Sequence, residues 1–546
     1  MYGTPFHRPP PELAEAYDDT PLAEFLAHEA RYGCGNYLLV AGDGDCLDVV
    51  TAPAYCGGYV CETGDAVTVA STLHDAVSDV PLADLSLDER FVRHYLSHAD
   101  EPLYSRLPLS GPFREVTRLP PGSHLRVEDG GVVTLRHYLS MARDRPASFG
   151  EAIEEAAATL RGRSVGVMYS GGVDSTALCC ALDAHLPRGA FELTTVDIGP
   201  NMNSVERART AAEGLGMDLR VVDHERPVHD DELLSYVESQ MARDFVNPLE
   251  PEFAYAALDH DYDVVVGGET TDVLLTGDMH RPQTTQLQHL RATPDFGSFL
   301  QTTVRNAQFT DRYRRSAALR RLYTTVVPHL LDREVAVDPS ELGYLAGLLS
   351  TVHPNFVVPD QTADVATELD AFGRYAGELG SRRAADTLQF VYEVHNTLKR
   401  ASTFPKGTAQ ITLVPPWGPF SSYAHGRSRP LREAVATKRE VYEYVRSTVG
   451  RSYFDFAFTD PDALASMAER EVAFKSSMRS RLLERNRHVF EGESALLPLV
   501  SDPALRDRIR EAYAAVASHV GSTTSFRNLQ RAGQLLNLET VIAPLQ

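Results

Sequence analysis

Residues 165–175 read VGVMYSGGVDS, and this stretch decides the fold of the chain. A run of β-branched and apolar residues ends in a polar turn, and the apolar segment STALCCALDAHL follows it. This order predicts a buried strand, a glycine turn at Gly171 and Gly172, and a helix. Glycine has no Cβ and tolerates positive φ, so backbone N–H groups of the turn can approach a small anion at the helix N-terminus. We therefore expect a phosphate-binding loop.

The polar side chains of the turn suit a pyrophosphate group. Ser170, Ser175 and Thr176 offer hydroxyl donors, and Asp174 offers a carboxylate, which is a hard oxygen ligand for Mg²⁺. The Gly-Lys-Ser/Thr ending of the nucleoside-triphosphatase P-loop is absent. The stretch therefore predicts a different class of phosphate loop, with a chance strand–turn–helix as the alternative.

Predicted strands and helices alternate on both sides of this loop. A helix is expected at 149–162, and the segments FELTTVDI, SVERARTAAEGLG and LRVVDH read as strand, helix and strand. A further strand, YDVVVGGE, follows at 262–269. The alternation predicts an α/β fold with a parallel, doubly wound sheet. Beyond about residue 285 the pattern is mostly helical, so we expect a helical C-terminal part.

The first 145 residues follow another pattern, typical of a small α+β domain. Residues 1–20 are rich in proline and are expected to be loose, and residues 21–30 predict a short amphipathic helix. Further strands are expected within 35–72 and 111–139, a hairpin turn at 41–45, and helices near 74–78 and 87–97.

Size and charge limit the classes of function. A chain of 546 residues usually forms two or three domains. The net charge of −23 repels phosphate backbones, so no nucleic acid partner is expected. The sequence has no apolar run of about 18 residues and no secretory signal pattern, which favours a cytoplasmic protein without membrane spans.

Two features of composition concern environment and redox state. Lysine and arginine total 52, but only four are lysines; an acidic, lysine-poor chain resembles proteins of salt-loving archaea, with a GC-rich genome as the alternative. No two cysteines form a CxxC pair, so we expect reduced thiols and no metal site built from them. The cysteines are Cys34, Cys46, Cys56, Cys61, Cys179 and Cys180.

The motif SGGVDS resembles the pyrophosphate-binding loop of the N-type ATP pyrophosphatases, which split ATP between the α and β phosphates. The motif alone leaves open asparagine, GMP and NAD synthetases, argininosuccinate synthetase and tRNA thiolases. The resemblance implies ATP, with adenine against the strand backbones near Val167, Met168 and Val196. It also implies phosphate contacts at Ser170, Gly171, Gly172, Asp174 and Ser175.

A second segment narrows the family. Residues 263–277, DVVVGGETTDVLLTG, are similar to an asparagine synthetase segment in which a strand ends in Gly-Glu-Gly-Ser/Ala-Asp-Glu. The shared positions are Gly268, Glu269, Asp272 and Gly277. The resemblance implies that Asp272 shares Mg²⁺ with Asp174, and that Glu269 takes a proton from the attacking amine. Val273 departs from the family by replacing its second acid, whereas Glu269 favours the asparagine synthetase type over lactam-forming relatives, which often carry Tyr.

A third resemblance concerns the N-terminal region. Residues 35–73 and 111–139 resemble the back half of the glutaminase domain of the same family, an N-terminal-nucleophile (Ntn) fold. A working glutaminase needs a cysteine freed at the N-terminus, but position 2 is tyrosine, and the family's glutamine-binding segments are missing. Cys34 sits in a similar Gly-Cys-Gly setting, yet its downstream sequence matches the later half of the domain, so we interpret it as structural.

The substrate pocket is less well defined. Residues 399–435 loosely resemble the stretch that shapes it in the family, but Gln410 and the segment PPWGPF depart from the pattern. The family also uses a lysine to stabilise charge on the adenylate and pyrophosphate. Lys438 is the first candidate and Lys475 the second. Three arginines are alternatives: Arg427, Arg429 and Arg432.

These observations predict a loose segment at 1–20, a catalytically silent glutaminase-like domain at 21–145 and a synthetase domain at 146–546. The resemblance implies an ATP-dependent ligase that releases AMP and pyrophosphate. It would adenylate an aspartate-like acid, a peptide or a sugar acid, and form an amide with ammonia or another amine. Alternatives are a macrolactam or peptide cyclase, a sugar-acid amidating enzyme, and an ATP-binding pseudoenzyme. A homodimer is left open.

Overall fold

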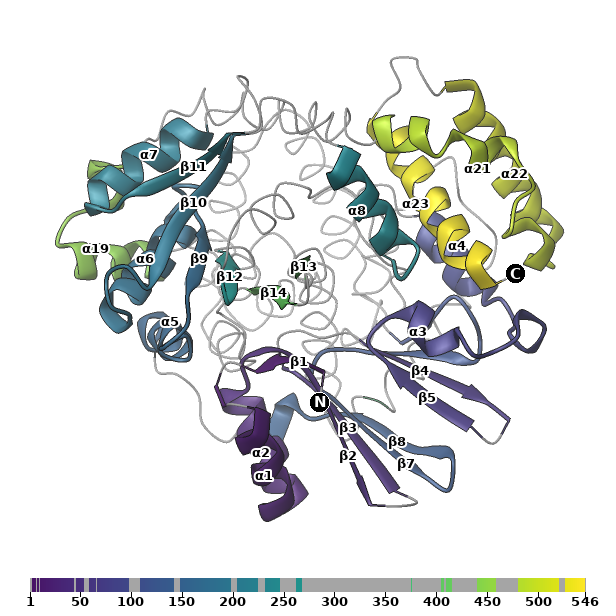
Figure 1. Ribbon diagram of the computed structural model, residues 1–546, viewed down its shortest axis with the longest axis horizontal. Coiled ribbons are helices and arrows are strands. Elements are labelled where there is room, and N and C mark those ends of the chain that lie inside the picture. The colour runs from purple at the N-terminus through teal and green to yellow at the C-terminus, as the bar shows by residue number, and fades with distance from the viewer. Residues whose placement is uncertain are drawn as a thin grey trace, which may run out of the picture.

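The computed structural model describes a large part of the chain, and all structural statements refer to that part (Figure 1). The described residues are 2–5, 7–8, 10–43, 46–53, 58–64, 66–97, 109–141, 148–197, 204–223, 231–245, 262–267, 375, 404–406, 409–414, 439–457, 480–519 and 526–545. None of the helices in these ranges is long and apolar enough to cross a membrane.

A six-stranded sheet carries the predicted phosphate loop. Its strands, in spatial order, are β11 (Leu219–Asp223), β10 (Phe191–Asp197), β9 (Val165–Met168), β12 (Val264–Gly267), β14 (Ala409–Val414) and β13 (Phe404–Lys406). The first five strands run parallel, and only β13 is antiparallel to its neighbour. Along the chain the order runs outward from β9 to β11 and then restarts on the other side of β9. This is the doubly wound topology that the sequence predicts.

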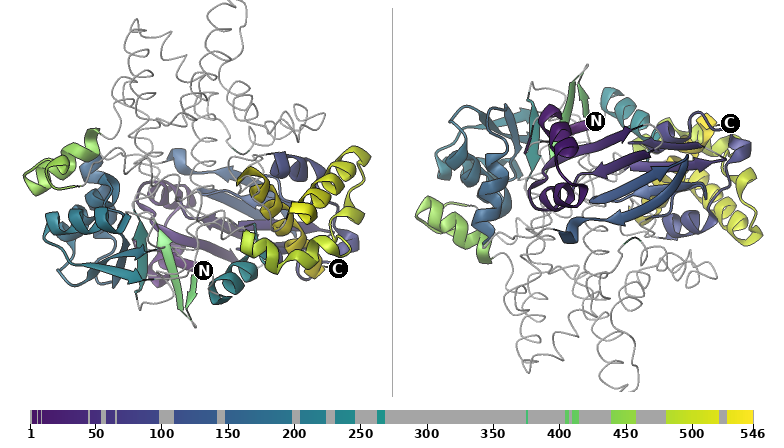
Figure 2. Two further views of the ribbon diagram at one scale, coloured as in Figure 1. Left: turned by 90° about the horizontal axis from the view of Figure 1, so that it is seen from above. Right: turned by 90° about the horizontal axis from the view of Figure 1, so that it is seen from below.

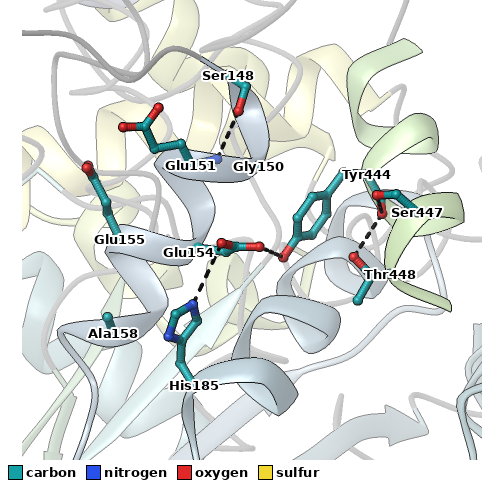
Figure 3. A pocket seen from close by; sticks show the side chains of 10 residues that line it. All are labelled: Ser148, Gly150, Glu151, Glu154, Glu155, Ala158, His185, Tyr444, Ser447 and Thr448. Carbon is teal, nitrogen blue, oxygen red and sulfur yellow. Dashed lines mark hydrogen bonds and ion pairs between the residues drawn. The ribbon is translucent and has the colours of Figure 1, made fainter.

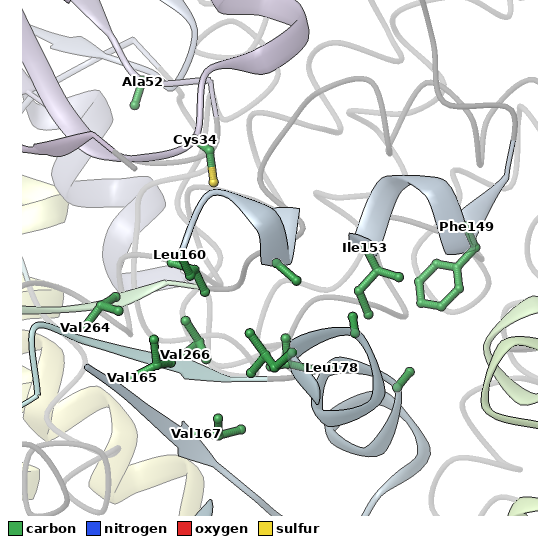
Figure 4. Close-up of a cluster of buried hydrophobic side chains, with 14 of the residues drawn as sticks. Cys34, Ala52, Phe149, Ile153, Leu160, Val165, Val167, Leu178, Val264 and Val266 are labelled. Carbon is green, nitrogen blue, oxygen red and sulfur yellow. The ribbon is translucent and has the colours of Figure 1, made fainter. Parts of the chain in front are cut away.

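Both faces of this sheet are covered, which explains its β-branched strands. Val264 and Val266 of β12 point into one apolar core, whereas Val265 between them belongs to a second core on the opposite face. Figure 4 shows part of the first core, with the strand valines facing Leu178 and Ile153. Helices α5 (Phe149–Ala158), α6 (Val173–His185), α7 (Ser204–Leu215) and α19 (Arg439–Val449) contribute to the first core, and α8 (Asp231–Met241) contributes to the second.

The N-terminal region forms two antiparallel sheets. The first has the order β1 (Tyr2–Pro5), β2 (Gly35–Asp43), β3 (Cys46–Thr51), β7 (Ser123–Glu128) and β8 (Gly131–His137). The second has the order β5 (Ala66–Ala70), β4 (Gly58–Thr63) and β6 (Val116–Leu119). Asp43 pairs with Cys46 across the β2–β3 connection, so the predicted hairpin is confirmed. The predicted helices appear as α2 (Leu22–Tyr32), α3 (Leu73–Val77) and α4 (Glu89–Ser97).

The proline-rich start of the chain differs from the prediction. Instead of a loose segment it contains β1, which pairs with β2, and a helix α1 (Pro10–Asp19). Proline is tolerated in the first turn of a helix because the N–H that it lacks has no intrahelical partner there. Pro10 and Pro11 therefore begin a helix rather than preventing one.

In the described part of the C-terminal region, two strands accompany the predicted helices. Strands β13 and β14 lie at 404–414, and β14 joins the parallel sheet beside β12. Helices α21 (Arg487–Glu491), α22 (Pro503–His519) and α23 (Phe526–Ile542) pack in the second core together with α4 and α8. Figure 2 shows this helical group beside the N-terminal sheets, at the end of the molecule away from α7 and α19.

A buried carboxylate ties the first residues of the chain to α2 and β2. Glu29 of α2 is fully buried, and its oxygens meet His7 Nε2 at 3.1 Å and His28 Nδ1 at 3.4 Å. The Tyr37 hydroxyl of β2 donates to the same carboxylate. Burial raises the pKa of Glu29, but the hydrogen bonds from His28, His7 and Tyr37 outweigh it and lower the pKa to about 2. The ionised carboxylate is thus the form that the fold stabilises.

Glu29 should therefore make stability depend on acid pH. Its folded-state pKa lies below the ordinary value of 4.5, so its contribution is complete above pH 4.5 and is lost as the pH falls through about 2. We expect Glu29→Gln to lower the free energy of unfolding by about 3 kcal/mol at pH 7, and the gap to close towards pH 2. Urea unfolding at several pH values measures this. Glu24→Gln, on the exposed side of the same helix, is the control; a pH-independent gap would contradict the prediction.

Candidate functional site

The predicted phosphate loop joins β9 to α6. The Tyr169 N–H extends the pairing of β9 by donating to the Thr194 carbonyl of β10 at 2.8 Å. The backbone then turns at Gly171, where φ is +68°, and α6 begins at Val173 with the Thr176 N–H bonded to the Gly172 carbonyl at 2.9 Å. The loop lies at the carboxyl end of β9, where the strand order reverses. Open α/β sheets bind ligands in the crevice at such a point.

Gly171 packs against the backbone of α7. A Cβ added to Gly171 would lie 2.6 Å from the Arg207 carbonyl oxygen and 2.9 Å from Ala208 Cα. Both the close approach and the positive φ therefore require glycine. The first N–H groups of α6 have no carbonyl partner within the helix, so the turn presents several backbone donors together.

The loop hydroxyls form a small network. Ser170 Oγ lies 3.3 Å from Ser175 Oγ and accepts a hydrogen bond from the Gly172 N–H at 3.3 Å. Ser170 is exposed, whereas Ser175 is buried and also donates to the Gly172 carbonyl at 3.1 Å. The Thr176 hydroxyl instead points into the core and lies 3.1 Å from the Tyr169 hydroxyl. Ser170 and Ser175 thus line the turn, and Thr176 supports it from below.

Asp174 stands in the first turn of α6, near Tyr442 of α19 and Tyr453 of the turn that follows α19. The pKa of Tyr442 is raised by burial and by the Asp174 carboxylate. Burial raises the pKa of Tyr453 to about 12; the Arg207 guanidinium works against this, whereas Tyr442 and Asp174 add to it. Both tyrosines therefore remain protonated and can donate hydrogen bonds near the loop. The carboxylate of Asp174 and the guanidinium of Arg207 both lie in the same surroundings.

Two contacts at the loop have no signal in the sequence. Arg207 Nε of α7 donates to the Ser170 carbonyl at 2.8 Å. The Tyr453 hydroxyl, in the 3₁₀ turn η7 (Tyr453–Asp455), donates to the Gly171 carbonyl at 2.6 Å. Neither residue belongs to a recognisable motif, and Tyr453 is 282 residues from its partner.

The structure brings together the predicted residues of the loop, namely Val167, Met168, Ser170, Gly171, Gly172, Asp174 and Ser175. Val196 lies in the neighbouring strand β10, opposite Val222 of β11. Gly267, the last described residue of β12, pairs with Met168 at the same edge of the sheet. Four predicted site residues fall outside the described ranges: Gly268, Glu269, Asp272 and Lys438.

The donor set of the loop fits a magnesium-bound polyphosphate. Backbone N–H groups and the hydroxyls of Ser170 and Ser175 suit phosphate oxygens, and the Asp174 carboxylate suits Mg²⁺. Within the described ranges, no three His, Cys, Asp or Glu residues gather closely enough to hold a metal. Because Asp272 lies outside those ranges, its pairing with Asp174 stays a prediction.

The described cavities lie elsewhere. One, of about 580 Å³, opens between α5, α6 and α19 and is lined by Glu151, Glu154 and Glu155 (Figure 3). There Glu154 accepts a hydrogen bond from the Tyr444 hydroxyl at 3.3 Å and lies 4.0 Å from His185, the last residue of α6. This cavity is at the opposite end of α6 from the loop, and its acidic lining does not suit phosphate. The candidate site is therefore identified by the donor groups of the loop and by its place in the sheet, and not by the size of a cavity.

Comparison with known families agrees with this assignment. A family model described as asparagine synthase matches residues 148–367. Residues 148–367 are an asparagine synthase domain. The matched range begins at Ser148, the N-cap of α5, and contains the loop and β12. A search of curated proteins found no match to the chain.

The family match indicates the type of reaction that this domain belongs to. It is an ATP pyrophosphatase domain, and its family uses ATP, typically with Mg²⁺, to form amide bonds. The matched range ends before β14, α19 and η7, so part of the sheet and the Tyr453 contact come from the chain that follows it.

The packing of Gly171 on α7 leads to a prediction about stability. Gly171→Ala should lower the free energy of unfolding by at least about 2 kcal/mol more than Gly189→Ala, because only the former meets backbone atoms. Gly189 also has a positive φ, of +96°, but open space beside it, so it controls for backbone strain alone. Denaturant unfolding monitored by circular dichroism measures both variants. Equal losses would show that the contact with Arg207 is unimportant.

Proposed function

We propose that the chain is an ATP-dependent ligase that releases AMP and pyrophosphate, activates a carboxylate as an acyl-adenylate, and joins it to ammonia or another amine. One observation carries the proposal. The loop SGGVDS, in an asparagine synthase domain, sits at the carboxyl end of β9 with its glycine pressed against α7 and its serines and Asp174 around the turn.

The proposed nucleotide site follows the edge of the sheet. The adenine lies against the strand backbones near Val167, Met168 and Val196, and the phosphates extend towards the helix N-terminus. The loop N–H groups, Ser170 and Ser175 bind the β and γ phosphates. Asp174 and Asp272 would hold Mg²⁺, which neutralises charge on the phosphates when it is bound. Gly268, which follows β12 in the sequence and lies outside the described residues, is proposed to contact the nucleotide, as the family resemblance implies.

The proposed chemistry has two steps. An oxygen of the substrate carboxylate attacks the α-phosphorus of ATP, and the bond to the bridging oxygen breaks, releasing pyrophosphate. The amine then attacks the acyl carbon, AMP leaves, and Glu269 accepts the proton that the amine loses. Lys438 is the proposed cation that stabilises charge on the phosphates in the first step. The loop contributes by holding the leaving pyrophosphate in line.

The surroundings of Cys34 support an amine source other than glutamine hydrolysis at this residue. Its side chain is 1% exposed, and burial raises the pKa of its thiol to about 11. Thr159 Oγ1 of the synthase domain contacts its sulfur at 3.8 Å, and His7 Nδ1 is directed at its backbone rather than its sulfur. A buried, protonated thiol is a poor nucleophile. We therefore propose that residues 21–145 are a silent, glutaminase-like brace for a synthetase unit at 146–546.

The amine donor defines the second candidate function. The glutamine-binding segments missing from the sequence favour a macrolactam or peptide cyclase, in which the amine belongs to the same substrate. Glu269 favours a separate amine, because lactam-forming relatives often carry tyrosine at that position. Ammonia-dependent release of pyrophosphate with aspartate distinguishes the two. A sugar acid is tested in the same way, and a pseudoenzyme would bind ATP without releasing pyrophosphate.

Asp174 provides the direct test of catalysis. We expect Asp174→Asn to lower ATP–pyrophosphate exchange by about 100-fold or more, because the carboxylate that holds Mg²⁺ is lost. The assay screens carboxylates, including aspartate, peptides and sugar acids. Asp183→Asn is the matched control, since Asp183 is on the same helix and pairs with Arg188 away from the loop. Release of ADP in place of AMP, or unchanged exchange in Asp174→Asn, would refute the proposal.

Cys34→Ala tests the source of the amine. We expect this variant to match the wild type in ammonia-dependent amide formation, and we expect glutamine to be inactive as a donor with both proteins. Amide product measured by mass spectrometry with ¹⁵N-ammonium or amide-labelled glutamine reports on both. Glutamine-dependent product that disappears in Cys34→Ala would mean that the thiol is a working nucleophile.

A further inference from the structure

We propose that Tyr453, acting with Arg207, is a positioning residue that orients the peptide groups of the glycine turn for phosphate binding. Neither residue was predicted to take part in the site, and Tyr453 lies outside the asparagine synthase domain at 148–367. The inference rests on the proposed function, because it assumes that the turn receives the phosphates of a nucleotide.

The argument begins with two consecutive peptide groups. Arg207 Nε holds the Ser170 carbonyl at 2.8 Å, and the Tyr453 hydroxyl holds the Gly171 carbonyl at 2.6 Å. In a trans peptide the carbonyl and the following N–H point in opposite directions. These two donors, which we call anchors, therefore make the N–H groups of Gly171 and Gly172 point away from Arg207 and Tyr453. The Gly172 N–H accordingly meets Ser170 Oγ on the exposed side of the turn, at 3.3 Å.

Glycine needs such anchors more than other residues do. It has access to positive and negative φ at similar energy, so a glycine peptide can rotate and present its carbonyl where its N–H should be. An outward carbonyl would repel a phosphate, because both carry negative charge on oxygen. Two donors behind the turn oppose that rotation, since the buried Gly171 carbonyl would lose its partner.

Tyr453 can serve as an anchor because its own position is well supported. The residue is 6% exposed, and its ring lies 5.7 Å from Tyr442 and 5.8 Å from Phe456. Ser452 and Asp455 form a capping box that fixes the turn η7. The hydroxyl is therefore presented by a short, packed segment with little freedom.

The same segment is wedged against α7, which carries the second anchor. Phe456 occupies the space beside Gly214 of α7, where an added Cβ would lie 2.6 Å from the ring. Arg451 lies over the Phe456 ring, 4.8 Å from its centroid, and donates to the Gly214 carbonyl. The two anchors, Arg207 and Tyr453, are thus parts of one packed unit behind the loop.

The test compares Tyr453→Phe with Tyr444→Phe. Both changes remove one hydroxyl from a buried tyrosine, but the Tyr444 hydroxyl bonds Glu154 at the far end of α6. Isothermal titration calorimetry with Mg·ATP, Mg·pyrophosphate and adenosine measures binding. We expect Tyr453→Phe to lower the affinity for Mg·ATP and for Mg·pyrophosphate by about 10-fold, whereas the affinity for adenosine stays unchanged. Tyr444→Phe should bind all three as the wild type does.

A second pair of variants tests the other anchor. Arg207→Gln should lower the affinity for Mg·ATP and Mg·pyrophosphate. Arg207→Lys should lower it less, because lysine can still donate to the Ser170 carbonyl. Arg209→Gln, on the same helix and paired with Glu206, is the control. Unfolding midpoints show whether each variant is folded at the temperature of the titration.

The outcomes separate the inference from the proposed function. Unchanged phosphate affinity in Tyr453→Phe, or an equal loss for adenosine, overturns the positioning role while the ligase proposal stands. If the wild type binds neither Mg·ATP nor Mg·pyrophosphate, the proposed function fails and the inference fails with it. A selective loss for the two phosphate ligands, absent from Tyr444→Phe, supports both.

Discussion

The close contact between Gly171 and the backbone of α7 is the constraint on which the site depends. A Cβ added to Gly171 would lie only 2.6 Å from the Arg207 carbonyl oxygen, so only glycine permits this approach. Because α7 lies so near, the Arg207 guanidinium reaches the Ser170 carbonyl. The strand order places the turn beside the reversal at β9, where the ends of neighbouring strands leave room for a ligand. Local backbone chemistry and sheet topology therefore converge at one point.

The part of the site that is contiguous in sequence could be predicted, and its anchors could not. Ser170, Gly171 and Asp174 follow a β-branched strand within a few residues, so pattern and motif specify them together. Arg207 and Tyr453 reach the loop from 37 and 282 residues away, through side chains of common types at positions without periodic signal. Such contacts depend on how α7 and η7 pack, and packing at long range is not encoded in a short segment.

The same distinction explains the fold. Parallel strands buried on both faces are nearly continuous apolar runs, as in Val264–Gly267, and these were recognisable from sequence alone. The strands β13 and β14 are hard to recognise from sequence because they lie in a stretch rich in proline and glycine. The helix in the first 20 residues is not apparent from composition, because proline often interrupts regular structure, whereas Pro10 opens α1 in its first turn. A segment of such composition can still be ordered when it pairs with the edge of a neighbouring sheet, and here β1 pairs with β2.

The two apolar cores join the N-terminal sheets to the rest of the described structure. One core joins Leu38 and Val49 of the N-terminal sheet to Val165 and Val266 of the parallel sheet. The other joins Tyr59 to the C-terminal helices, and the Tyr59 hydroxyl also bonds Asp244 after α8, at 2.5 Å. Asn537 of α23 in turn donates to the Asp244 carbonyl at 3.0 Å. Removing the domain would expose both cores and strip partners from buried polar groups, which costs far more than the loss of a catalytic side chain. The packing of the asparagine synthase domain therefore depends on the buried faces of the N-terminal sheets.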